Sequence, residues 1–274
     1  MHSYTFRRWV RSPEWLLGFA ALVVLALIAF LLNMLFSEVS PGSVWGLTYG
    51  TLAALLMVGA ALYGVRRRKP RLHTGRSYTW VQFHVYGGMF FLLLVFMHSG
   101  FHVPSGGVTW WLWFLSIWIV VSGLIGVGLQ KWIPRILTSG LTVEVVYERI
   151  PDLVRQVRDR AEEVVLAATD PVRDFYQKNV AGALVAPRTR LIYYFDITGG
   201  SQMQARQFEY LRRVLSSDDQ KNLDQLESIY KTKLELDAHY TLQKALRWWL
   251  YAHVPVSLML LVLLAVHLYS VFYY

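Results

Sequence analysis

The sequence predicts a mainly α-helical integral membrane protein with five membrane-spanning helices and a small α+β insertion between the fourth and the fifth. Three observations favour this class. Apolar residues make up 55% of the 274 residues and charged residues only 16%, which is typical of membrane proteins. Five apolar runs are each long enough to cross a hydrocarbon core of about 30 Å. The chain has one long polar stretch, between residues 136 and 244.

The first two expected spans are Trp15–Phe36 and Val44–Val65. The first run contains Asn33 as its only strongly polar residue. It is too long for the apolar part of a signal peptide and has no convincing cleavage site, so we expect it to be retained as an anchor. Many glycine and alanine residues in the second run permit close helix packing.

The remaining expected spans are Tyr78–Phe101, Trp110–Leu129 and Ala245–Tyr274. Pro255 is expected to kink or locally open the last of them. Basic residues cluster after the second span, at Arg66–Arg71. We expect a bacterial inner membrane, in which the excess of positive charge on cytoplasmic loops places the N-terminus in the cytoplasm and the C-terminus in the periplasm. The net charge of +9 is therefore attributed to topology, and no nucleic acid is expected as a partner.

The polar stretch divides the chain into residues 1–135, a cytoplasmic insertion over 136–244, and residues 245–274. Its β-branched and aromatic segments 141–147 and 190–197 predict strands. Helical periodicity and helix-start signals predict helices over the remaining parts, at residues 152–168, from Asp170 onward, 201–215 and 217–244. The insertion shows no dinucleotide, flavin, metal-cluster or nucleophile signature. We expect it either to dock a cytoplasmic partner or to cap the inner side of the membrane bundle.

Two pairs of histidines carry the main chemical signal. His84 and His98 lie fourteen residues apart in one expected span, and His253 and His267 have the same spacing in another. Fourteen residues bring the chain back to one helix face about 21 Å further along. Two such helices face to face would give two histidine pairs stacked across the membrane, and an axial imidazole pair is a haem b site.

The alternative is two histidine-lined cavities without metal, because a lone histidine on an apolar helix face is more often a hydrogen-bonded core residue than a ligand. The duplicated spacing and the cost of ionisable groups inside a membrane favour ligands. The chain has no cysteine. This absence excludes thiolate ligation, iron–sulfur clusters and covalent c-type haem attachment within the chain.

The H-x13-H spacing on each of two helices resembles the di-haem cytochrome b superfamily, which includes the cytochrome b of quinol-oxidising bc complexes and the ferric-reductase and NADPH-oxidase membrane domains. The segments 246–257 and 265–267 resemble bacterial members. The resemblance covers the membrane helices and implies two haem b groups and electron transfer, without fixing donor or acceptor. Segment 12–15, Ser-Pro-Glu-Trp, resembles the Pro-Glu-Trp-Tyr quinol-site motif, although an ordinary helix start explains it as well.

Because the third and fifth spans both run from inside to outside, His84 is expected opposite His253, and His98 opposite His267. Gly87 and Gly88 would make room either for a porphyrin or for a neighbouring helix. His102 lies on the face of His98. It is an alternative axial ligand, a hydrogen-bond partner for a quinol, or only an interfacial residue.

Further candidates lie at the two membrane surfaces. Arg76 and Arg247 are expected either to pair with the propionates of an inner haem or simply to serve as inside-positive charges. A quinone site is expected at one haem edge, with hydrogen bonds from His102 and Ser99 outside or from Gln82 inside.

These features predict the electron-transfer subunit of a membrane oxidoreductase complex. It would carry electrons between a quinone pool or a cytoplasmic-side partner and a periplasmic partner such as a c-type cytochrome or an iron–sulfur protein. Two alternatives remain. One is a stand-alone reductase of ferric iron or oxygen. The other is a haem-free anchor that recruits partners through its cytoplasmic domain.

Overall fold

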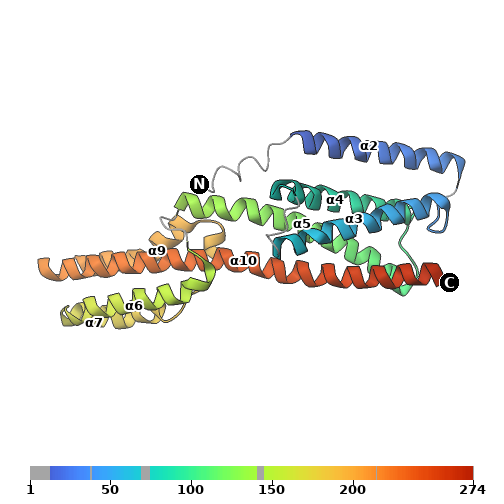
Figure 1. Cartoon of the computed structure of the whole chain (residues 1–274). Helices are drawn as coiled ribbons and strands as arrows, with labels where there is room; N and C mark the ends of the chain where they lie inside the picture. Colours follow the sequence, from blue (N-terminus) through green and yellow to red (C-terminus); the bar gives the residue numbers. More distant parts are fainter. Residues whose placement is uncertain (1–12, 38, 69–74, 141–144, 214, 274) are drawn as a thin grey trace. The chain divides into compact units, whose positions relative to one another are not determined.

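A computed structural model describes residues 13–37, 39–68, 75–140, 145–213 and 215–273 (Figure 1). Within these residues the regular structure is helical and no β-strand occurs. The chain divides into two compact units, of which the first comprises Met1–Ile125 with Tyr251–Tyr274 and the second Gly126–Leu250. Each unit is described separately below.

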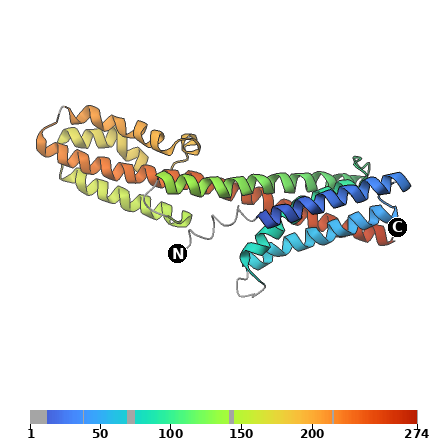
Figure 2. The same cartoon turned by 90° about the horizontal axis from the view of Figure 1, so that it is seen from above.

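The first unit is a bundle of apolar helices. It contains α2 (Pro13–Phe36), α3 (Val44–Arg68), α4 (Ser77–His98), the first part of α5 (Gly107–Gly140) and the last part of α10 (Ser217–Tyr273). These five helices are long and apolar enough to cross a membrane, and they run alongside one another (Figure 2). The chain is therefore a multi-pass membrane protein.

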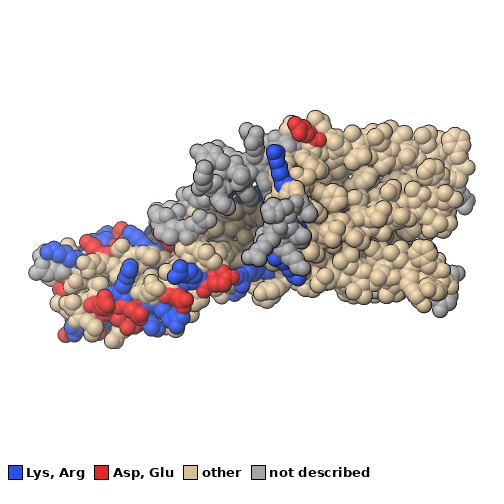
Figure 3. Space-filling view, viewed as in Figure 1, with Lys and Arg blue, Asp and Glu red and all other residues tan. Residues whose placement is uncertain are grey.

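The surface chemistry agrees with this assignment. Large apolar side chains face outward along the spans, as for Leu35 and Phe36 on α2, which are 76% and 86% exposed. The visible face of the spans carries few charged side chains, whereas Lys, Arg, Asp and Glu cover the second unit (Figure 3). Such an apolar surface is stable when lipid surrounds it, because lipid chains demand no polar contacts.

α3 packs against α4, and α2 also contacts α4. The core of this unit is a run of large apolar side chains from all five helices, and its buried members are Phe30, Tyr49, Ala53, Met57, Phe91, Leu94, Met97, Leu115, Ile119 and Leu260. Asn33 is buried beside this core, where its amide donates a hydrogen bond to the hydroxyl of Tyr49. This bond satisfies the one strongly polar residue of the first span.

The third span is shorter than expected, because α4 ends at His98 and not at Phe101. Gly100 and Phe101 adopt φ values of +60° and +61°, which turn the chain away from the helix. A side chain at Gly100 would place its Cβ 2.8 Å from the carbonyl oxygen of Val39, so glycine is required there both by conformation and by space. The turn leaves His98 in the last turn of its helix.

The second unit is also helical. It contains the ends of α5 and α10 together with six shorter helices and one turn of π-helix, namely η1 (Tyr147–Arg149), α6 (Ile150–Leu166), α7 (Asp170–Phe175), η2 (Tyr176–Val180, the π-helix), α8 (Ala181–Leu184), η3 (Leu191–Tyr194) and α9 (Ile197–Arg212). Its main core consists of buried apolar residues from α6 to α10, among them Ile150, Val154, Ala161, Val172, Leu184, Phe208, Leu223, Leu226 and Leu234.

The α+β character predicted for the insertion is wrong for the described residues. Residues 190–197 form the short helix η3 and the start of α9 in place of a strand. An isolated strand leaves its backbone groups unpaired, and no neighbouring strand exists in the described part of the chain. The aromatic residues serve packing instead, since Tyr193 is fully buried against Ile133 and Leu242. In the other expected strand, residues 141–144 lie outside the described residues.

The polar helix expected to end near Lys244 and the apolar span expected from Ala245 are a single helix, because α10 continues without a break from Ser217 to Tyr273. The residues around this point are good helix formers without glycine or proline, so nothing in the local sequence ends the helix. Pro255 lies within the same helix. α5 likewise extends through Pro134, well beyond the expected end at Leu129.

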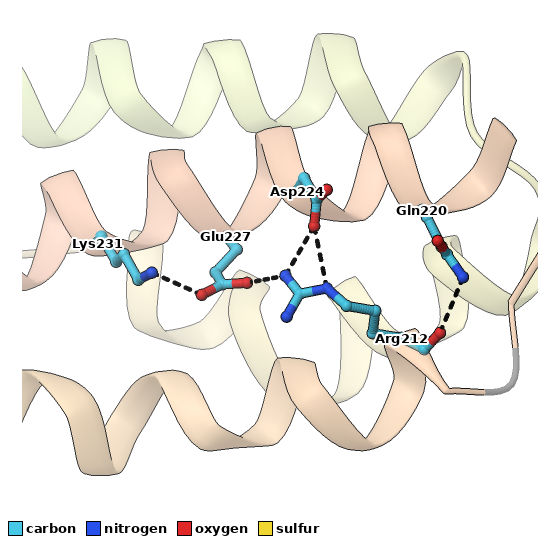
Figure 4. A network of polar contacts seen from close by, with 5 residues as sticks. All are labelled: Arg212, Gln220, Asp224, Glu227 and Lys231. Carbon is cyan, nitrogen blue, oxygen red and sulfur yellow. Dashed lines mark hydrogen bonds and ion pairs between the residues drawn. The ribbon is translucent and has the colours of Figure 1, made fainter. Parts of the chain in front are cut away.

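Within the second unit, charged and polar residues join α9 to the first part of α10. Arg212 of α9 donates hydrogen bonds to Asp224 and Glu227, Lys231 pairs with Glu227 at 2.7 Å, and Gln220 donates to the carbonyl of Arg212 (Figure 4).

A second pair is fully enclosed. The Nζ atom of Lys233 lies 2.6 Å from Asp237, and both side chains are at most 1% exposed. Asp237 also accepts a hydrogen bond from the backbone N–H of Arg188, which ties the segment before η3 to α10.

Candidate functional site

The structure brings the four membrane histidines together as two pairs. The ring centres of His84 and His253 are 6.3 Å apart, and those of His98 and His267 are also 6.3 Å apart. We name them the 84–253 pair and the 98–267 pair. The members of each pair come from α4 and α10, so the pairing is the one expected from two helices that run in the same direction.

The separation within each pair matches a metal ion held between two imidazoles. A metal–imidazole bond is about 2 Å long and the ring centre lies roughly 1 Å behind the nitrogen, so two rings on opposite sides of one ion have centres about 6 Å apart. The ring planes are inclined by 68° and 75°. An edge-to-face aromatic contact has a similar separation, so the orientation of the ring nitrogens must distinguish the two cases.

That orientation is set by backbone carbonyls of α3. The Nδ1 atom of His84 lies 3.0 Å from the carbonyl oxygen of Ala60, and Nδ1 of His98 lies 2.7 Å from that of Gly46. A carbonyl can only accept, so Nδ1 carries the proton in both rings and Nε2 keeps its lone pair. Metal-binding histidines show this arrangement.

The two carbonyls repeat the spacing of the histidines. Gly46 and Ala60 are fourteen residues apart, as are His84 and His98, and α3 runs antiparallel to α4. Backbone carbonyls of the single helix α3 thus accept hydrogen bonds from both histidines of α4. The sequence reasoning missed these partners.

His253 receives similar support from α5. Its Nδ1 atom lies 2.9 Å from the hydroxyl oxygen of Ser122. The hydroxyl of Ser122 also lies 3.1 Å from the carbonyl oxygen of Ile119, to which it can donate. When it does so, its oxygen accepts from Nδ1 of His253 and the lone pair of that ring is on Nε2.

Small residues lie against the histidine rings. A Cβ atom added to Gly50 of α3 would come 2.8 Å from the ring of His98, and one added to Gly123 of α5 would come 3.5 Å from the ring of His253. Gly50 is thus needed for space, whereas Gly123 would allow a methyl group. Gly87 and Gly88, expected to make room either for a porphyrin or for a neighbouring helix, lie on α4. A Cβ at Gly88 would meet no heavy atom within 4 Å.

Among the residues that the structure describes, no group of three or more His, Cys, Asp or Glu side chains could hold a metal ion. Each pair therefore offers two imidazoles and no third side chain of these types in the described part of the chain. Two such imidazoles could hold a metal ion whose other donors came from a non-protein group such as a porphyrin.

The candidates expected at the outer surface are separated by the turn after α4. His98 faces His267, while His102 is exposed and lies beyond the turn. The hydroxyl of Ser99 donates to the carbonyl of Phe96 at 3.1 Å. Gln82, the candidate at the inner surface, is a buried residue of α4.

The two arginines expected to meet propionates lie in different units. Arg76 is an exposed residue that precedes α4 in the first unit. Arg247 belongs to the second unit, where it pairs with Glu148 and stacks on Tyr147 with its guanidinium 4.1 Å from the ring centre.

A cavity of about 430 Å³ lies between α2, α3 and α4. Five of its ten lining residues are aromatic, and Gly87, three residues after His84, opens onto it. Glu14 and Tyr86 also line the cavity. Segment 12–15 carried a sequence signal for this region, although the ordinary helix start was the favoured explanation of that signal.

Comparison of the chain with models of protein families, with curated proteins and with solved structures finds no match.

Proposed function

We propose that the chain is a di-haem b cytochrome subunit that carries electrons across a membrane. The observation that supports this most strongly is the repeated geometry of the two pairs. Both have ring centres 6.3 Å apart, and in His84 and His98 the Nδ1 atom donates to a backbone carbonyl, which fixes the tautomer required for ligation.

The haem-free alternative accounts for less of this geometry. A structural histidine in a membrane helix needs a hydrogen bond, and one per ring would suffice. It does not need a second imidazole held opposite at the distance of two metal bonds, twice, at the same spacing along the helices. When bound, haem would supply a one-electron redox couple at each of the two levels.

The protein contributes position and environment. The fourteen-residue spacing separates the two levels by about 21 Å along α4. Between and around them lies the apolar core of the first unit, with Met57, Phe91 and Leu260 nearly fully buried. Such a core excludes water, and a dry surrounding tunes the potential of a bound redox group.

A quinone is the substrate that best suits the cavity between α2, α3 and α4. Its volume of about 430 Å³ lies in the range of small-molecule sites, and its aromatic wall suits a flat ring. Glu14 could accept a proton from a quinol hydroxyl, and Tyr86 could donate a hydrogen bond to a quinone oxygen. We prefer this site to the sequence-based candidates His102, Ser99 and Gln82, because it combines apolar walls with polar groups.

The finer topology follows from charge. The basic end of α3, Arg66–Arg68, favours the cytoplasmic side of a bacterial inner membrane for this end of the bundle. The 98–267 pair would then lie near the periplasm, where a c-type cytochrome or an iron–sulfur protein could exchange electrons with the chain. The second unit, Gly126–Leu250, would lie in the cytoplasm.

The proposal is tested on the full chain purified in mild detergent from cells supplied with haem precursor. A pyridine haemochrome assay should give two haems b per chain, and the reduced-minus-oxidised spectrum should show low-spin bands. The matched control is His102→Ala, which should keep both haems. Less than one haem in fully loaded protein would refute the proposal and leave the haem-free anchor as the better account.

A second measurement tests the electron donor. Addition of a short-chain quinol should reduce the purified protein, and Glu14→Gln should slow that reduction at least tenfold without changing the haem count. If the single chain instead passed electrons from a soluble donor to ferric iron or oxygen at enzyme-like rates, the stand-alone reductase would replace the subunit role.

A further inference from the structure

The short helix η3 of the second unit exposes large apolar side chains beside a buried anchor. Tyr193 is fully buried. By contrast, Leu191 is 73% exposed and Phe195 is 86% exposed, with Ile192 at 42%. Large apolar side chains that are exposed close together are typical of a surface that contacts a membrane or another protein.

The anchor places this segment at the ends of two membrane spans. Tyr193 packs against Ile133 of α5 and Leu242 of α10. The same cluster includes Leu129 and Leu246, which belong to the apolar parts of those helices. The second unit itself therefore contains both η3 and the span ends against which it lies.

Aromatic residues mark the membrane surface on the same two helices. Trp132 of α5 and Trp248 of α10 are exposed by 38% and 64%, and exposed tryptophan at a span end is typical of the headgroup level. Ile133 follows Trp132 directly, and Leu242 precedes Trp248 by six residues, which is about 9 Å of helix. Side chains that project sideways from η3 at this level face lipid.

Basic side chains flank the exposed apolar residues. Arg188 is exposed just before η3. The Nζ atom of Lys244 lies 3.2 Å from the hydroxyl of Thr189, so a second cation lies beside the same segment. Arg135 is exposed on α5, two residues beyond Ile133. Lys and Arg beside apolar residues are the composition of segments that lie on an anionic bilayer.

We propose that residues 188–195 form a membrane-surface contact in which Leu191 and Phe195 enter the boundary between headgroups and acyl chains. Arg188 and Lys244 meet lipid phosphates at the same depth. The contact would hold the second unit against the bilayer from which α5 and α10 emerge. The inference depends on the membrane spans and not on haem, so it stands or falls separately from the proposed function.

The same unit provides matched controls far from the span ends. Leu166 is 78% exposed at the end of α6, and Tyr210 is 81% exposed on α9. α9 is tied through Arg212 to Asp224, which precedes Ala245 of the apolar run by 21 residues, about 30 Å of helix. These residues are as apolar or aromatic and as exposed as Leu191 and Phe195. A difference between the two sets of positions therefore reports depth in the membrane and not exposure of the side chain.

The test uses the absence of cysteine from the chain. Single variants Leu191→Cys, Phe195→Cys, Leu166→Cys and Tyr210→Cys are labelled with a nitroxide in the full chain. The labelled proteins are reconstituted into phosphatidylcholine vesicles that contain phosphatidylglycerol. Frequent collision of the nitroxide with oxygen, which is more soluble in lipid, indicates that the label lies in the bilayer. Frequent collision with a water-soluble nickel chelate indicates that the label lies in water.

The ratio of the collision rate with oxygen to the collision rate with the nickel chelate should be at least fivefold higher at positions 191 and 195 than at positions 166 and 210. Adding Arg188→Glu and Lys244→Glu together should move the label at 195 towards water. Equal nickel accessibility at 195 and 210 would overturn the proposal. Shielding of 195 from both reagents would also overturn it, because that result indicates contact with protein.

Discussion

The two histidine pairs are built from the same helices but are supported differently. In the 98–267 pair, His98 lies in the last turn of α4, with Gly50 of α3 pressed against its ring. In the 84–253 pair, Ser122 hydrogen-bonds to His253, and Tyr63 packs on His84 with ring centres 5.1 Å apart. His84 and His98 are alike in that Nδ1 of each donates to a carbonyl of α3. The pairs therefore differ in what else lies against the rings, which is a close glycine in the first pair and a serine hydroxyl and a tyrosine ring in the second. A substitution beside one histidine pair should therefore lower haem binding at that pair and leave the other pair unchanged.

Among substitutions that keep all four histidines, the largest effect is expected from Gly50→Ala. The new methyl group would lie 2.8 Å from Nδ1 of His98, and such a contact forces the ring to move. Haem at the 98–267 pair should fall by more than half while the other level remains loaded, as measured by haem count and by the split of the reduced α band. Gly64→Ala is the control, because a Cβ at Gly64 meets no heavy atom within 4 Å. Equal haem in both variants would contradict the steric account.

Ser122→Ala should produce a smaller loss at the other level. It removes the hydroxyl that hydrogen-bonds to Nδ1 of His253, and loss of such a partner typically weakens metal binding by about 10- to 100-fold. Titration of haem into apoprotein would measure the change at the 84–253 pair. Ser116→Ala serves as the control, since Ser116 is a buried residue of the same helix that donates to the carbonyl of Leu112. Identical affinities in the two variants would show that the hydroxyl does not support the ring.

Tyr63→Leu is expected to have a milder effect. The substitution keeps an apolar contact but removes an aromatic ring beside His84, a contact whose contribution beyond burial is about 0.5–1.5 kcal/mol. Haem affinity at the 84–253 pair should therefore fall by roughly 3- to 10-fold, and the midpoint potential of that level alone should shift. Redox titration followed at the α band would detect both. An equal shift at both levels would contradict the assignment of Tyr63 to one pair.

The sequence predicted much of the membrane part. Length and apolarity predicted five spans, and the equal spacing of His84/His98 and His253/His267 predicted which rings would face each other. It could not predict the carbonyls of Gly46 and Ala60 as partners, because a backbone carbonyl has no residue signature. It also failed at residues 190–197, where β-branched and aromatic residues indicated a strand, but no second strand is present in the described residues to pair with it. The change from polar to apolar residues near Ala245 was interpreted as a helix boundary, although a helix can cross a membrane surface without a break.

The most direct test of the account is the effect of each single histidine substitution on the haem spectrum. His84→Ala and His253→Ala should each remove the same haem, and His98→Ala and His267→Ala should each remove the other. Each variant should therefore keep one haem per chain, with two spectra shared among the four variants. Matching spectra for His84→Ala and His267→Ala would contradict the pairing, and four variants that retain every haem of the unchanged protein would contradict ligation by these residues.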